Sequence, residues 1–453
     1  MSDDLAHPER ADREHGGGPA RTRGLEDAGV DSLDAHWAGI GPIAPRPGED
    51  LESLIAWLRT GRAAQRRIDF PAGTVLPDGR LDLCKQAVGP LGAQRVVDAL
   101  PDVPRALPVI RHLLLGTDGL GDQGAETVAA AAGPKGLETL YLGCNNVGAG
   151  GVCRMADSLR ASPQGAVGAV WLKRNPLGPA EGGAAAELLG AAKGLRTLDL
   201  VQTGLDAAGV AVLIDALITA SGTGRDFERV YLGGNALGVE GAASLARLVA
   251  AGGVAELYAS AARLGSEGAE ILAEALKSAP PGRLRRLSVA SNDIGPAACA
   301  RLVAAAARAG VRLLDLGRVR GARAMAAPEN RIDQAAAAAI GSALADTPHR
   351  LSHLVLTDTG MRSREALSLL RALGVPDGRP WAVPAVRPTP VSAAGTAGPV
   401  PIRIVLGKGV AAAVKAQFAQ LAAGVAHPAA APDVAAIRSV YRTAPAAQSD
   451  PAG

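Results

Sequence analysis

The sequence predicts an α/β solenoid, in which units of one strand, one turn and one helix stack to form a single parallel sheet. One phrase carries this prediction: Leu-x-x-Leu-x-Leu, often followed by Asn and then Leu-Gly-x-x-Gly, returns ten times along 453 residues. Successive copies lie 27 to 40 residues apart, a period typical of stacked repeats. The second leucine of the phrase, or its substitute, stands at Leu81, Leu113, Leu140, Val170, Leu198, Val230, Leu257, Leu287, Leu314 and Leu354.

The first half of each repeat alternates as a strand does. In Leu137-Leu140-Leu142 the last two leucines point to one face of the strand, and the residue between them points to the other. An asparagine three residues after the last leucine marks where the chain leaves the sheet, and a buried amide there can satisfy backbone groups of the loop. This position is held by Asn145, Asn175, Asn235 and Asn292, with Thr203 and Thr359 as expected substitutes.

The second half of each repeat predicts a helix. Glycines come first and supply turn conformations that other residues avoid. Asp122, Glu240 and Glu267 then fall where a helix should begin, which suits the helix dipole. Helical sequence follows, as in Ala242–Val249 and Glu270–Leu276. Because one such unit cannot bury its apolar face alone, the units must stack, and the end units need caps.

These features together resemble the leucine-rich repeats of the ribonuclease-inhibitor type, and the resemblance covers about residues 76–373. It implies a right-handed horseshoe with a parallel sheet on the concave face and helices on the convex face. It also implies a function in binding proteins. Two copies depart from the pattern, because Ala259 replaces a core leucine and Val319 stands where an asparagine is expected. Local irregularity is expected at both places.

Composition narrows the classes of partner and location. Aromatic residues make up 2% of the chain, so the core is expected to consist of Leu, Val and Ala. A net charge of +3 is too small to indicate a nucleic-acid or membrane partner. The four cysteines lack CxxC spacing, no signal-peptide pattern begins the sequence, and no apolar stretch is long enough to cross a bilayer. We therefore expect a cytoplasmic protein with free thiols that is monomeric on its own.

The chain is expected to divide into five segments. They are a disordered segment 1–30, a helical N-terminal cap 31–75, a leucine-rich repeat domain 76–373, a Pro-rich linker 374–400 and a C-terminal tail 401–453. Apolar residues from Leu51 to Leu58 have helical spacing, which predicts the cap. In the tail, Ile402–Leu406 reads as a strand, and Val410, Val414, Phe418 and Leu421 follow at helical spacing. The tail is therefore a docking peptide or a small module.

An insertion explains the spacing of 40 before Leu354. After Leu316 the next fitting asparagine is Asn330, fourteen residues on instead of three. Removing eleven residues returns the spacing to 29, so the insertion leaves from the end of a strand. It carries Arg320 and Arg323 beside Arg318, and we expect it to be an excursion whose deletion leaves folding nearly intact.

The motifs of common enzymes are missing or explained by the repeat. Gly119–Gly124 matches the dinucleotide fingerprint, but the same Leu-Gly-x-x-Gly returns in other repeats, as at Leu237–Gly241. His349 and His353 have the spacing of a helical metal pair, yet they flank the start of a strand and have no evident third ligand. The tail after residue 373 has no cysteine that could act as the nucleophile of a ubiquitin ligase. We expect a non-enzymatic protein without cofactor or metal.

The residue between the two core leucines forms a second column, which faces away from the core. Along the repeats it is Asp82, Leu114, Tyr141, Trp171, Asp199, Tyr231, Tyr258, Ser288, Asp315 and Val355. Four of the eleven aromatic residues of the chain fall in this column. Exposed aromatic rings are common anchors at protein interfaces. The alternative is that they merely fill strand positions for which they have high propensity.

The favoured hypothesis is a scaffold that binds a partner protein on its concave face. One alternative is an activator or regulator of a small GTPase or other enzyme that acts through strand-end loops, and another is nucleic-acid binding through the arginine-rich insertion. The residues predicted to bind a partner are Tyr141, Trp171, Asp199, Tyr231, Tyr258, Lys173, Arg174, Arg229, Glu256, Arg286, Arg318, Arg320 and Arg323.

Overall fold

The computed structural model describes residues 42–103, 109–162, 165, 167–375, 401–426 and 430–440. The chain separates into two compact units, Met1–Gly39 and Ile40–Gly453, and every described residue lies in the second. The segment expected to be disordered, 1–30, lies outside the described residues, and so does the expected linker from residue 376.

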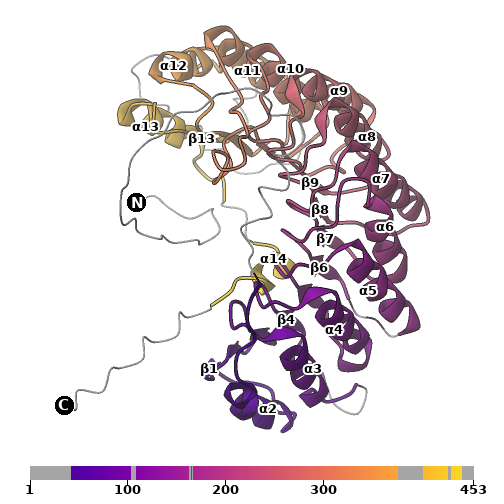
Figure 1. Ribbon diagram of the computed structural model, residues 1–453. Coiled ribbons are helices and arrows are strands. Elements are labelled where there is room, and N and C mark those ends of the chain that lie inside the picture. The colour runs from indigo at the N-terminus through magenta and orange to yellow at the C-terminus, as the bar shows by residue number, and fades with distance from the viewer. Residues whose placement is uncertain are drawn as a thin grey trace, which may run out of the picture. The chain divides into compact units, whose positions relative to one another are not determined.

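The described residues form one sheet in which the strands follow the order of the chain (Figure 1). The first two strands, β1 and β2, pair antiparallel with each other and β2 with β3, and all later pairs are parallel. This is a leucine-rich repeat solenoid. The strands are β1 (Ile68–Asp69), β2 (Thr74–Val75), β3 (Arg80–Asp82), β4 (His112–Leu114), β5 (Thr139–Tyr141), β6 (Ala169–Trp171), β7 (Thr197–Asp199), β8 (Arg229–Tyr231), β9 (Glu256–Tyr258), β10 (Arg286–Ser288), β11 (Leu313–Asp315), β12 (His353–Leu356) and β13 (Arg403–Leu406).

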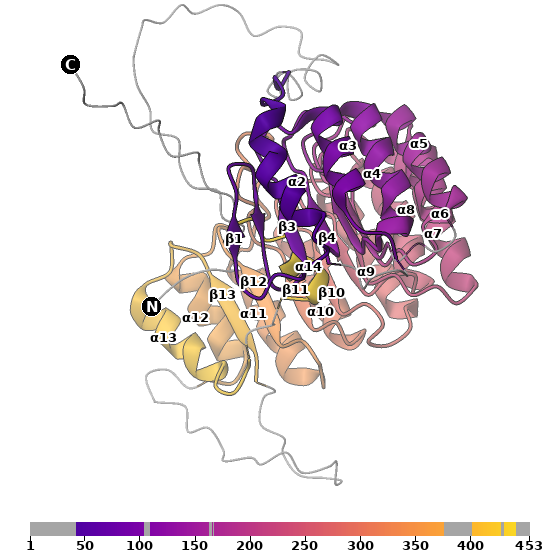
Figure 2. The same ribbon diagram turned by 90° about the horizontal axis from the view of Figure 1, so that it is seen from below.

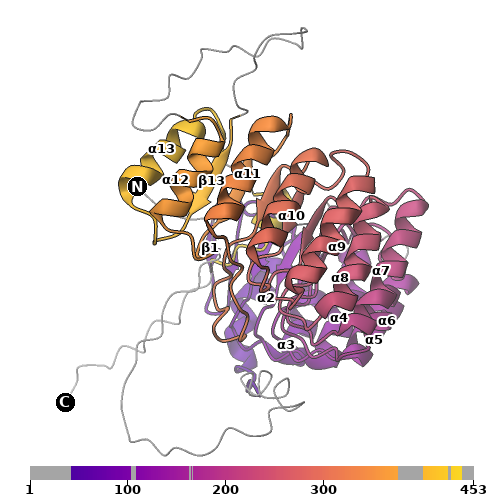
Figure 3. The ribbon, with the colours of Figure 1, turned by 90° about the horizontal axis from the view of Figure 1, so that it is seen from above.

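One helix follows each strand from β3 to β13 and covers the outer face of the sheet (Figures 2 and 3). Small side chains let these helices approach closely: a Cβ atom added to Gly182 in α6 would lie 1.7 Å from the carbonyl oxygen of Gly209 in α7. The helices are η1 (Gly48–Leu51), α2 (Glu52–Leu58), α3 (Gly89–Ala99), α4 (Gly121–Lys135), α5 (Ala149–Ala161), α6 (Gly182–Ala191), α7 (Ala207–Gly222), α8 (Gly238–Ala250), α9 (Gly265–Ser278), α10 (Pro296–Arg308), α11 (Gln334–Asp346), α12 (Ser363–Ala372), α13 (Ala412–Leu421) and α14 (Pro432–Ala436).

The predicted column of core leucines is confirmed. From Leu81 to Leu354 its ten members pair directly across neighbouring strands, and all are buried. Ile404 of β13 extends the column by one residue. The irregularity expected at Ala259 was wrong. Ala259 is buried and its backbone N–H donates to the carbonyl of Ser288 over 2.8 Å, because the ladder needs only a backbone donor there.

The buried asparagines form a ladder that joins successive repeats, as predicted. Asn175 illustrates it: its side-chain oxygen accepts from the backbone N–H groups of Asn145 and Val147, and its amide donates to the carbonyls of Leu142 and Leu172. Each asparagine therefore closes its own turn and that of the preceding repeat. Thr203 and Thr359 replace part of this role, since each hydroxyl donates to the carbonyl three residues back.

The insertion begins and ends where the spacing predicts. Asn330 donates to the carbonyls of Val289 and Leu316 and accepts from the backbone of Asn292 and Ile294, so it takes the ladder position that Val319 leaves. Sequence reasoning did not predict that this excursion packs on the repeats, and the effect of its deletion on folding stays a prediction. Ala322 and Ala327 are buried in a small cluster with Ala261, which follows β9 two repeats earlier, because the insertion folds back over the strand ends.

The C-terminal region begins as a further repeat. Strand β13 pairs in parallel with β12, and Val414, Phe418 and Leu421 of α13 join the common core. After α13 the chain returns to the inner side of the sheet, where α14 lies (Figure 1). The segment boundaries that the sequence predicts stay predictions, but these contacts tie residues 401–426 and 430–440 to the repeats.

Candidate protein-binding face

The four aromatic side chains of the concave column form a continuous row. Tyr141, Trp171, Tyr231 and Tyr258 stand at equivalent positions of β5, β6, β8 and β9. Successive ring centroids lie 6.5, 5.2 and 4.1 Å apart, and the last pair is stacked. The first two distances are in the range of favourable aromatic pairs, and the stacked pair of Tyr231 and Tyr258 is closer still. The rings therefore support one another as a single apolar strip.

Asp199 lies beneath this row. Its strand, β7, separates the strands of Trp171 and Tyr231, which places their backbones roughly 9.6 Å apart. The two rings nevertheless approach to 5.2 Å, so they lean toward each other across the Asp199 position. Burial raises the pKa of Asp199 to about 6. A hydrogen bond from the Val201 backbone and the charge of Lys173 lower the pKa, but burial has the larger effect.

A row of charged residues runs beside the aromatic row, two positions earlier in each strand and on the same face. Arg229, Glu256 and Arg286 pair in register across β8, β9 and β10. Arg229 Nε lies 3.1 Å from Glu256 Oε2, and the hydroxyl of Tyr258 donates to the same carboxylate over 2.7 Å. The guanidinium of Arg286 lies 4.8 Å from the Tyr258 ring centre, which is a cation–π contact.

Two predicted residues at the strand ends extend this face. Lys173 Nζ lies 5.8 Å from the Tyr141 ring centre. Arg174 is exposed and donates to the side chain of Gln202 over 2.9 Å. Both lie in the turn just after β6, so they stand at the strand-end rim of the concave face, from which Lys173 reaches the first ring of the row.

The three predicted arginines of the insertion form a separate group. Arg318 is paired with Glu329 across the base of the insertion, while Arg320 and Arg323 are exposed. The insertion itself packs on Ala261, just beyond β9. These arginines therefore stand at the strand-end edge of the repeats, apart from the row of rings.

The column position predicts aromatic rings that are exposed, and this was wrong for Trp171, which is only 3% exposed, while the three tyrosines are half-buried. Residues 430–440, which we call the C-terminal segment, lie on the concave face and cover this ring. Ile437 packs with Trp171 and Ala169, and Tyr141, Tyr231 and Val434 complete the cluster. The alternation of side chains along a strand correctly predicts that Trp171 points away from the solenoid core. It carries no information about a distant segment of the chain that could cover the ring.

Polar contacts anchor the C-terminal segment at both of its ends. At one end, Asp433 pairs with Arg229 Nη1 over 2.8 Å and accepts from the hydroxyl of Thr197 over 2.5 Å. At the other end, the carboxylate of Asp82 accepts from the Ser439 hydroxyl over 2.9 Å and from the Val440 backbone over 2.5 Å. The segment thus reaches from β8 back to β3 across the aromatic row.

Arg80 adds a third anchor, because its Nη1 donates to the carbonyl of Arg438 over 2.6 Å. Sequence reasoning missed Arg80, Thr197, Asp433 and Ile437 as members of this site. The alternation of side chains along a strand could have found Arg80 and Thr197, since each stands on the concave side, two positions before a residue of the column. No sequence signal places Asp433 or Ile437 here, because the segment lies outside the repeats.

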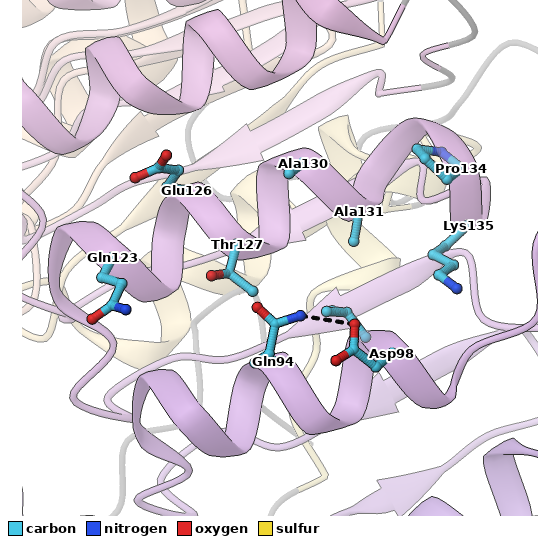
Figure 4. A pocket seen from close by; sticks show the side chains of 10 residues that line it. Gln94, Asp98, Gln123, Glu126, Thr127, Ala130, Ala131, Pro134 and Lys135 are labelled. Carbon is cyan, nitrogen blue, oxygen red and sulfur yellow. Dashed lines mark hydrogen bonds between the residues drawn. The ribbon is translucent and has the colours of Figure 1, made fainter.

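The convex side has a groove of 470 Å³ between α3 and α4 (Figure 4). Gln94 donates to Asp98 over 2.7 Å along one wall. On the other helix, Lys135 pairs with Asp102 over 2.8 Å and donates to the Leu100 carbonyl, so its charge is already engaged. The groove is a gap between two repeats and lacks the convergent polar groups of a ligand site.

The described residues also bear on two other kinds of site. Among them, no group of three or more His, Cys, Asp or Glu side chains is arranged to hold a metal ion. In the same part of the chain, no helix has the length and apolar character needed to cross a membrane.

Comparison with solved structures returns leucine-rich repeat proteins at low similarity. The protein LegL7 from Legionella pneumophila is 11% identical, with a TM-score of 0.39, and the match covers 86% of this chain and 99% of that one. An internalin, InlF, from Listeria monocytogenes is 14% identical, with a TM-score of 0.30 and coverage of 71% and 92%. TLR13, solved in complex with ssRNA13, is 17% identical with a TM-score of 0.36, and the match covers 61% of this chain but only 36% of TLR13. No protein-family model and no curated protein sequence matches the chain.

Proposed function

We propose that this protein is a non-enzymatic scaffold that binds a partner protein on its concave face. The row of Tyr141, Trp171, Tyr231 and Tyr258 carries this proposal. A chain with eleven aromatic residues places four of them in one contiguous strip, on the face that the solenoid core does not use. Aromatic anchors flanked by charged residues are the usual composition of binding hot spots.

The flanking charges favour a polypeptide partner. Arg229, Glu256 and Arg286 alternate in sign across three neighbouring strands, so the strip is bordered by both donors and acceptors. A nucleic acid would be favoured by a continuous basic surface instead. The two alternatives rest on other surfaces, because the insertion with Arg320 and Arg323 and the strand-end loops lie at the edge of the sheet.

Affinity purification from the native cell with quantitative mass spectrometry tests the proposal. The bait is compared with a column variant in which Tyr141, Trp171, Tyr231 and Tyr258 are all replaced by Ala. We expect partners to be lost from the column variant, because one ring at a hot spot contributes on the order of 2 kcal/mol to binding.

A matched control carries Arg247→Ala and Glu274→Ala, two exposed positions on convex helices, and should keep its partners. A second variant, in which Arg318–Glu329 is deleted, tests the contribution of the insertion separately from that of the concave face. If the column variant remains folded and still captures the same proteins, while the deletion variant loses them, the concave-face proposal is rejected in favour of the insertion.

A further inference from the structure

We propose that the concave face is a groove for a short helical peptide with an acidic residue followed by apolar residues one and four positions later, and that the C-terminal segment occupies this groove until a partner displaces it. This inference rests on the proposed function of the concave face, and it specifies both the ligand class and the regulation of that face. The pattern is the one that Asp433 and Val434 of α14 present together with Ile437, the residue that directly follows the helix.

The charged end of the groove is built for a carboxylate. Arg229 is buried in the wall, and both of its contacts to Asp433 Oδ1 and Oδ2 come from one nitrogen, at 2.8 and 2.9 Å. Burial works against the charge of Arg229, but Glu256 and Asp433 raise its pKa above the usual value. The guanidinium is therefore a fixed cation, and the Thr197 hydroxyl beside it provides a second donor.

The apolar end of the groove accepts a branched side chain. Ile437 is buried and packs against Trp171 and Ala169, with Tyr141 and Tyr231 on either side. Pro432 stands in the first turn of α14, where its fixed backbone angle favours a helix start. Because positions i and i+4 share one face of a helix, Asp433 and Ile437 reach Arg229 and Trp171 together.

The fit of the C-terminal segment is incomplete at the centre of the groove. Trp171 Nε1 is buried, and no described residue accepts a hydrogen bond from it. A buried donor without an acceptor weakens binding. A partner peptide that carries a carbonyl, hydroxyl or carboxylate opposite this atom would bind better than the segment does. This difference is what allows an external peptide to compete with a tethered one.

Tethering sets the terms of that competition. A segment attached to its own groove acts at an effective concentration on the order of millimolar. A free peptide of the same sequence at micromolar concentration therefore cannot displace it from the intact chain. Once the tethered segment is weakened, the same free peptide should bind at the vacated groove.

The test uses a labelled synthetic peptide of residues 430–440 and three full-length proteins, and fluorescence anisotropy reports binding. The proteins are the wild type, a tail variant with Asp433→Ala and Ile437→Asp, and a control variant with Arg438→Ala, whose side chain is exposed. We expect the tail variant to bind the peptide at least tenfold more tightly than the wild type and the control variant do. A peptide that carries the same two substitutions should not bind any of them.

Two results would overturn the inference. Equal binding to wild type and tail variant would show that the segment does not occupy the groove, and absence of binding to a folded tail variant would show that the groove does not recognise this peptide. Circular dichroism and thermal melting establish that the tail variant is folded, and Asp433→Ala alone serves as a milder second variant. The proposed function fails separately, when the column variant keeps its cellular partners.

Discussion

The buried face of the sheet carries Leu, Val or Ile at every one of its eleven paired positions, whereas the concave face carries Asp, Leu, Tyr, Trp, Ser and Val at the neighbouring positions. The buried face must match from one repeat to the next, since each repeat packs only on its neighbours. The concave face is free of that requirement. Its sequence can therefore be shaped by what lies on it, and in this structure the C-terminal segment lies on it.

This comparison predicts that the repeating parts carry the stability. Asn175→Ala should have the largest effect, with a loss of about 4 kcal/mol or more in the free energy of unfolding, because it leaves two backbone donors and two carbonyls of neighbouring repeats without their partner. Urea denaturation followed by circular dichroism measures it. A loss below 1 kcal/mol would mean that water replaces the amide and that the ladder does not hold the repeats together.

A pair of neighbouring substitutions compares the two faces directly. Leu142→Ala removes a buried core side chain and should lower the free energy of unfolding by about 2–5 kcal/mol. Tyr141→Ala, one residue away, should lower it by less than about 1 kcal/mol because Tyr141 belongs to the concave row. Equal losses in the same denaturant series would show that the concave rings are part of the structural core.

Trp171→Ala should fall between these two values, at roughly 1–2 kcal/mol. Its ring is buried by the C-terminal segment and not by the solenoid core, so the segment can lift away instead of leaving a cavity. In the tail variant the same substitution should lose less, and a double-mutant cycle of Trp171 and Ile437 measures the difference. Full additivity of the two substitutions would contradict the contact between them.

The repeat structure could be predicted from sequence because many copies report the same geometry. The ten core positions, the asparagine ladder and the displaced Asn330 all follow from a period and a spacing. The C-terminal segment could not be predicted in the same way. Asp433 contacts Arg229 from 204 residues away, and Ser439 contacts Asp82 from 357 residues away, so neither contact leaves a periodic trace. The aromatic row could be predicted from the sequence, but the C-terminal segment that covers it could not.

The concave face also predicts a dependence on pH. The pKa of Asp199 is about 6 in the folded protein, above its ordinary value of 3.8, so the folded state holds the proton more tightly than the unfolded state does. The contribution of this group to stability is therefore full below about pH 4 and is lost as the pH rises through about 6, by roughly 3 kcal/mol. The wild type should lose stability over this range relative to Asp199→Asn. Denaturation at pH 4, 5, 6 and 7 tests this prediction. A constant difference in the free energy of unfolding between the two proteins would mean that the Asp199 carboxyl is solvated in the folded state.

The smallest expected effect is a gain at Asp118, a ladder position in the second repeat that holds neither asparagine nor threonine. Asp118 stands where Asn145 stands one repeat later, and its Oδ1 accepts from the backbone of Gln86 and Val88. Its other oxygen, Oδ2, is buried, and no described residue donates to it. Burial raises the pKa of Asp118 well above the usual range despite those backbone donors.

Asp118→Asn keeps the acceptor and adds the amide donor that Asn175 uses, so it should raise the free energy of unfolding by about 1 kcal/mol at pH 7. The gain should shrink as the pH falls, because a protonated carboxyl can also donate. The thermal midpoints of the two proteins at pH 4 and pH 7 measure this, with Asp157→Asn, an exposed position on α5, as the control. A loss of stability on Asp118→Asn would mean that the carboxylate serves a purpose that the ladder geometry does not reveal.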